Sequence, residues 1–254
     1  MTMTTQSIDP GAEPLARAAR LGLWALPVWA ALLCLGTLRE QPHWQTHPAE
    51  WSRFVTTPEF LASHLVASIL GAAIGALGMV ALGAVLARRG HPAAGLWTMV
   101  TGVVANVLSA SGFGIAAFAQ PALGRNYLAR HTAEGRLLIK TVANGGWLTA
   151  VIITSGLLLI ASVVVAGVGV ARTRSLPRAA GIGFAVSMVL FVLANIPDTG
   201  PWQRIAGALM TGFTVWIAAA AQRRGAPAKA AAGDAVLAAN HPGAAPGSRP
   251  AAAR

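Results

Sequence analysis

The sequence contains little charge and almost no cysteine. Charged residues make up 11% of its 254 residues, and Cys34 is the single cysteine. One cysteine excludes a disulfide-stapled secreted scaffold, and the low charge excludes both a disordered chain and a coiled coil. The sequence also contains no Walker loop, no Gly-x-Ser-x-Gly, no His-Glu-x-x-His and no cysteine pair, so the common catalytic patterns are missing.

Hydrophobic residues, in contrast, make up 55% of the chain, and the mean hydropathy is +0.59. This composition does not fit a water-facing surface and predicts an integral membrane protein. A helix needs roughly 20 residues to cross about 30 Å of hydrocarbon. We predict an all-α polytopic bundle of about six transmembrane helices with two long outer loops, the spans being 21–38, 60–87, 93–119, 147–171, 179–197 and 203–221.

The spans divide the chain into a cytoplasmic N-terminal segment (1–20), a transmembrane domain (21–221) and a cytoplasmic tail (222–254). We interpret the first span as an anchor rather than a cleaved signal peptide. The residues before Cys34 are Ala31-Leu32-Leu33, so the small residue that a lipoprotein cleavage site needs just before the cysteine is missing. The tail is rich in Ala, Pro and Gly without a sustained apolar face, so we expect it to be disordered.

The distribution of basic residues predicts the orientation. A net charge of +11 is common in nucleic-acid-binding proteins, but here 12 of the 19 Lys and Arg residues lie in the two terminal segments and in the connections 88–92 and 172–178. This is the positive-inside pattern. We therefore predict a plasma-membrane protein with both termini cytoplasmic and no nucleic-acid partner. The connections 39–59 and 120–146 then become outer loops with room for a site.

Small residues predict how the helices pack. Ser63, Ala67, Gly71 and Gly75 recur every four residues and form one low-bulk ridge. In lipid, such ridges let helix backbones approach closely. A seam within the chain is the first interpretation, and a dimer interface is the alternative.

Polar residues mark one face of the third span, where Thr98, Gly102, Asn106 and Ser109 lie at helical spacing. Asn106 falls near mid-membrane, where its amide must bond to a neighbouring helix or line a polar cavity. Both interpretations stay open.

The Asn144-Gly145-Gly146 segment has two interpretations. It is typical of a helix start followed by an aromatic anchor, Trp147. If the helix instead begins near Leu137, the segment becomes a break within a longer helix, as in discontinuous transporter helices. Interfacial anchoring is also predicted for other tryptophans near span ends, namely Trp24, Trp29, Trp97, Trp202 and Trp216.

His64 is the only histidine within a predicted span, and an ionisable group at that depth is a functional hypothesis. We predict an outward-opening polar pocket formed by Glu59, His64, Asn106 and Asp198, with Ser68, Lys140 and Arg204 at the same level. In the alternative, His64 bonds to a carbonyl or a serine, and Asp198 pairs with Arg204 at the surface.

Two weaker hypotheses concern metals. If the first outer loop is helical, His43, His47 and Glu50 share a face that resembles divalent-metal ligation, although Pro42 and Pro48 disfavour that helix. The competing interpretation is an amphipathic loop whose Trp44 and Trp51 lie on the membrane. Haem would need His64 and a second imidazole such as His131.

These features favour a non-enzymatic inner-membrane protein, either a small transport or binding component or an accessory subunit. Sparse charge within the spans argues against a strongly ion-coupled pump. The alternative is a membrane-bound redox or metal- or haem-binding protein that uses His64. The expected partners are the lipid bilayer and, as open alternatives, another membrane protein or a second copy of the chain.

Overall fold

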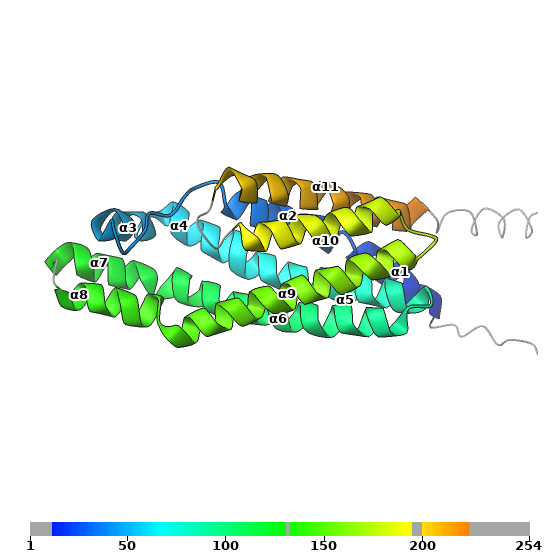
Figure 1. Ribbon diagram of the computed structural model, residues 1–254, viewed down its shortest axis with the longest axis horizontal. Helices are drawn as coiled ribbons and strands as arrows, with labels where there is room; N and C mark the ends of the chain where they lie inside the picture. The colour runs from blue at the N-terminus through cyan, green and yellow to red at the C-terminus, as the bar shows by residue number, and fades with distance from the viewer. Residues whose placement is uncertain (1–11, 131–132, 195–199, 224–254) are drawn as a thin grey trace, which may run out of the picture.

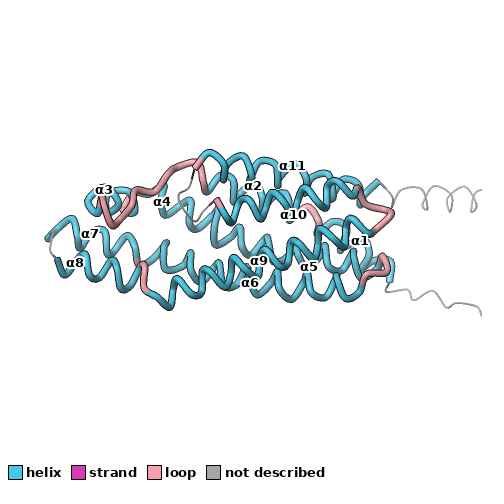
Figure 2. The backbone as a smooth tube through the Cα atoms, viewed as in Figure 1, coloured by secondary structure: helices cyan, strands magenta, loops and turns pink. Residues whose placement is uncertain are grey.

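The computed structural model describes residues 12–130, 133–194 and 200–223, and every regular element among them is a helix (Figures 1 and 2). The helices form an elongated bundle. Residues 12 and 223 lie toward the same end of it, which we call the basal end, and the opposite end is the distal end. The predicted segments 1–11 and 224–254 lie outside the described residues.

The prediction of an all-helical, multi-pass membrane protein is confirmed. Five described helices are long and apolar enough to span a bilayer: Glu13–Gly36, Pro58–Arg88, Pro92–Arg130, Ala133–Arg172 and Pro201–Arg223. The fifth predicted span corresponds to α10 (Arg178–Leu193), an apolar helix of 16 residues that packs between α9 and α11. The count of six spans therefore stays a prediction.

The first span begins earlier than predicted and consists of α1 (Ala12–Gly22) and α2 (Ala25–Gly36). Pro27 explains the interruption, since it has no N–H to donate to the Leu23 carbonyl, which accepts from Leu26 instead at 3.1 Å. Leu23, Leu26 and Trp29 are at most 1% exposed. This span therefore packs inside the bundle, against α5 (Gly71–Arg88) and α11 (Pro201–Arg223).

The second span is not a uniform α-helix. It starts as α4 (Pro58–Ala62), widens into the π-helix η1 (Ser63–Leu70) and continues as α5. Thr57 caps its start by accepting from the Phe60 N–H at 3.2 Å. A short turn with Gly90 at φ 87° then leads into α6 (Pro92–Phe118).

The two predicted outer loops are not confirmed as loops, since both contain helix and the described part of the second is almost entirely helical. The first contains α3 (Pro48–Val55). The second consists of α7 (Gln120–Arg130), α8 (Ala133–Leu138) and the π-helix η2 (Ile139–Ala143), which leads to α9 (Gly146–Arg172).

The helices α6 and α7 run on almost without interruption. Pro121 removes one donor, but the Leu123 N–H bonds the Ala119 carbonyl at 3.0 Å, and helix resumes. The 39 residues of this span extend about 58 Å at 1.5 Å per residue, roughly twice the hydrocarbon thickness. Its distal part therefore projects beyond the hydrocarbon. We call α3, α7 and α8 the distal cap (Figure 1).

A separate apolar cluster joins the distal cap to the bundle, formed by Trp51 and Val55 of α3, Phe60 of α4 and Ile139 of η2. Trp51 is 1% exposed, so the prediction that it lies on the membrane surface is wrong. Its ring packs inward because α3 lies directly on α7, where a Cβ on Gly124 would come within 2.9 Å of the Ser52 carbonyl oxygen.

Small residues hold the bundle together. Ala67 and Gly71 lie against Gly36 and Leu32 of α2, so the predicted ridge sits in a seam within the chain, whereas Ser63 lines a cavity described below. The tightest crossing joins α5 to α6. There a Cβ on Gly83 would lie 2.5 Å from the Gly95 carbonyl oxygen.

Replacing Gly83 with Ala tests this crossing. The added methyl group meets backbone, which cannot rotate away, so we expect the Gly83→Ala variant to lose about 1–3 kcal/mol of stability. Thermal unfolding in mild detergent measures the effect. Gly114→Ala is the matched control, since a Cβ there meets nothing within 4 Å. Equal melting temperatures for the two variants would contradict the close contact.

Candidate ligand-binding pocket

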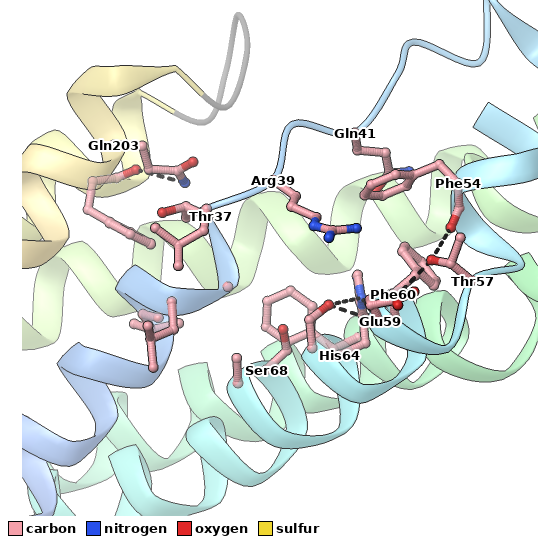
Figure 3. Close-up of a pocket in the computed structure, with 18 residues that line it drawn as sticks. Thr37, Arg39, Gln41, Phe54, Thr57, Glu59, Phe60, His64, Ser68 and Gln203 are labelled. Carbon is pink, nitrogen blue, oxygen red and sulfur yellow. Dashed lines mark hydrogen bonds between the residues drawn. The ribbon is translucent and has the colours of Figure 1, made fainter. Parts of the chain in front are cut away.

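Two adjoining cavities occupy the distal half of the bundle. The outer cavity has a volume of about 440 Å³ and the inner cavity about 310 Å³. They meet at side chains from α2, η1, α6, α10 and α11, which line both of them: Leu33, His64, Ser68, Phe113, Phe191 and Gln203. Together they form one pocket that leads from the mouth near Arg39 and Glu59 (Figure 3) toward Asn106 in the bundle.

His64 stands at the junction of the two cavities. Its Nδ1 lies 2.9 Å from the Phe60 carbonyl oxygen, one turn earlier. A carbonyl only accepts hydrogen bonds, so Nδ1 carries the proton. In the neutral ring, Nε2 is then an acceptor. His64 therefore does bond a carbonyl, as one interpretation predicted, and it also lines the pocket.

Aromatic rings surround this imidazole. The Phe60 ring centroid is 4.0 Å from that of His64, and the Phe113 ring stands edge-on at 6.4 Å. Apolar rings therefore form part of the wall beside the imidazole, together with the hydroxyl-bearing Ser63 and Ser68.

Asn106 closes the deep end of the pocket. Its Nδ2 donates to the Gly102 carbonyl of its own helix at 2.8 Å, which leaves its side-chain oxygen for other partners. Gly75 makes room for this oxygen and for the indole of Trp29, since a Cβ on Gly75 would lie 2.7 Å from both groups. Trp29 thus lines the inner cavity, and its predicted role as an interfacial anchor is wrong.

Two serines of α9, rather than Asn106, join α6 to its neighbour. Ser155 donates to the Ala105 carbonyl at 2.9 Å, and its hydroxyl lies 2.6 Å from that of Ser109. About two turns farther along the same face of α9, Ser162 donates to the Thr98 carbonyl at 3.1 Å. The bonds of Ser155 fix the back wall of the inner cavity, which Ser109 and Ser155 line.

Both described π-helices face the pocket. η1 contributes Ser63, His64 and Ser68, and η2 contributes Ala143. The helix ends after η2, at Asn144, and α9 begins at Gly146. The Asn144-Gly145-Gly146 segment is therefore a break between two helices. Only glycine fits at 145, where a Cβ would lie 2.3 Å from the Thr141 carbonyl oxygen. Such departures from α geometry are frequent at functional sites.

Polar groups from α11 lie near the mouth. Gln203 is 3% exposed, and its side-chain oxygen has no hydrogen-bond partner in the described structure. Arg204 donates to Glu40 at 2.8 Å and to the Thr37 carbonyl at 3.0 Å, which ties α11 to the end of α2. Asp198, the predicted partner of Arg204, lies outside the described residues.

The predicted pocket residues are thus partly brought together. Glu59 and His64 line the outer cavity, and His64 and Asn106 line the inner one. Ser68 joins them, whereas Lys140 does not line either cavity. Sequence reasoning missed Trp29, Ser155 and Gln203. Ser155 could have been predicted from the sequence, because a serine hydroxyl within an apolar span needs a hydrogen-bond partner.

The metal hypothesis gains no support from the geometry. The helix expected over His43, His47 and Glu50 begins only at Pro48, and His47 bonds the Thr46 hydroxyl at 2.8 Å. Within 12–130, 133–194 and 200–223, no three His, Cys, Asp or Glu side chains gather to hold an ion. His64 is the only histidine that lines the pocket, and His131 lies outside the described residues.

Comparisons with protein families, with curated proteins and with solved structures found no match to this chain.

Replacing Ser155 with Ala tests the back wall. The Ser155→Ala variant loses the bond to the α6 backbone, and we expect a decrease in unfolding free energy of roughly 0.6–1.7 kcal/mol, the range of hydrogen bonds between membrane helices. Ser111→Ala is the control, because the Ser111 hydroxyl bonds its own helix at the Leu108 carbonyl. Denaturant unfolding in mixed micelles compares the two. A larger loss for Ser111→Ala would contradict the proposed link.

Proposed function

We propose that the protein is a non-enzymatic ligand-binding component of the plasma membrane. Its pocket opens on the outer face, with both termini in the cytoplasm and six spans. The single observation that carries the proposal is the pair of cavities that meet at His64. Sites for small molecules are concave, mostly apolar and of this size, with a few polar groups that fix the ligand.

The lining defines the ligand's chemistry. Phe60, Phe113 and Phe191 offer an apolar wall, which favours an uncharged, largely apolar body. The neutral His64 ring offers an acceptor at Nε2, since Nδ1 is engaged by Phe60. We therefore propose a small amphipathic molecule whose polar end donates a hydrogen bond, as an alcohol or a phenol does. No second imidazole lines the described pocket, so we do not extend the proposal to haem or redox chemistry.

Access to the pocket can be measured with engineered cysteines. In a Cys34→Ala background, Ser68→Cys places a thiol where the cavities meet. We expect a membrane-impermeant thiol reagent to modify it from the outer side of right-side-out vesicles. Ser187→Cys is the control, because Ser187 is 2% exposed and lies outside both cavities. An unreactive Ser68→Cys variant would contradict an outward-opening pocket.

The same variant tests the ligand's chemistry. We expect 1-decanol to slow modification of Ser68→Cys severalfold more than its methyl ether does, because only the alcohol donates to Nε2. Adding His64→Phe keeps an aromatic ring but removes the acceptor, so the difference between the two probes should disappear. If both probes protected equally in the protein that retains His64, the role of His64 would be refuted. If neither probe protected it, binding would be refuted.

A further inference from the structure

A third cavity, separate from the pocket, lies in the basal half of the bundle, between α9 and α10. It has a volume of about 480 Å³. Its floor consists of small residues, Gly167, Ala171 and Ala185. Its walls are branched side chains that point outward and are 42–52% exposed: Val164, Val168, Ile182 and Val186. We call this feature the basal groove.

The groove exists because α9 and α10 cross closely. A Cβ on Gly167 would lie 2.7 Å from the Gly181 carbonyl oxygen and 2.8 Å from the Ala185 methyl group. Small residues at such a crossing bring the backbones together, while the larger residues on either side stand apart. The result is an apolar slot that follows the helices on the outside of the bundle.

Two arginines stand at the basal end of this slot. Arg172 ends α9 and Arg178 begins α10, and both are exposed and line the groove. Few of the described acidic residues lie near these two arginines. Of the five acidic residues that the structure describes, only Glu13 belongs to the basal half, and the others lie toward the distal end: Glu40, Glu50, Glu59 and Glu134.

We propose that the basal groove binds one anionic phospholipid. The slot accommodates an acyl chain, and the two guanidinium groups bind the phosphate at headgroup depth, where arginine side chains of membrane helices reach the interface. Basic pockets between helices on the cytoplasmic side recognise anionic headgroups in this way. The charge pattern indicates the cytoplasmic leaflet, because eight of the 15 described basic residues belong to this end of the bundle.

Native mass spectrometry of the full chain, released from mild detergent, tests the proposal with two probes: dioleoyl phosphatidylglycerol and dioleoyl phosphatidylcholine. We expect one tightly retained phosphatidylglycerol and much less phosphatidylcholine. In the Arg172→Ala/Arg178→Ala variant, the affinity for phosphatidylglycerol should fall roughly thirtyfold, since each of the two basic groups near the surface contributes about 1 kcal/mol.

The control variant is Arg88→Ala/Arg223→Ala, which removes the same charge from exposed residues of the basal end outside the groove. It should retain the lipid. A third variant, Ala171→Leu, fills the floor without changing charge and should also reduce retention. Equal retention of both lipids by the unmodified protein, or an equal loss in the two arginine variants, would overturn the proposal. Because the pocket is not involved, these outcomes leave its assignment unaffected.

Discussion

Close contact between backbones is the constraint on which the rest of this structure depends. Lipid tails are as apolar as the helices, so hydrophobic burial does not drive the spans together, and packing must do so. The helix α5 satisfies this requirement on two sides. Gly83 meets the α6 backbone at Gly95, and Gly78 accommodates Leu26 of α2. These contacts bring α2 and α6 together at Gly75. Because Gly75 has no side chain, Trp29 of α2 and Asn106 of α6 fit against it. The deep end of the pocket thus follows from the same packing that holds the bundle.

The pocket lies where regular α-helix gives way to irregular helix. Toward the distal end, α5 gives way to η1, whose wider turns shift the side chains relative to an α-helix. This change places His64 and Ser68 beside the cavities, and Ala67 both lines the outer cavity and lies against Gly36 of α2. On the opposite side, η2 and the break at Asn144 interrupt the α8–α9 helix at a similar level. A straight α-helix on both sides would continue the seam, so the two irregular segments account for the space between them.

The membrane class, the all-helical fold and most span positions were predictable, because long apolar runs need no tertiary information. The predicted spans 93–119 and 147–171 agree with α6 and α9 to within one residue at each end. The distal cap was missed because α7 and α8 lack an apolar run. The contacts of α7 with α3 and of α8 with α7 stabilise these helices, and no local pattern reveals them. Trp29 was misplaced for a related reason. Nearness to a span end predicts an anchor, but its burial depends on Gly75, which is 46 residues away in sequence. His64 and Asn106 were found because a polar group in an apolar span always needs a partner.

The packing of the basal half of the bundle bears on whether a bound ligand could cross the membrane. Below Asn106 the helices α5, α9, α10 and α11 share one continuous apolar core, and its largest members are completely buried, among them Met79, Leu82, Leu86, Phe184 and Met210. A ligand that reaches Asn106 therefore meets a closed core in this conformation. Passage would require the α5–α6 crossing to separate, and there the Gly83 and Gly95 backbones are in direct contact. Such contacts have few intermediate arrangements, because a packed seam deforms poorly. For the proposed ligand, the geometry thus favours a protein that holds it at the distal end of the bundle over one that carries it across the membrane.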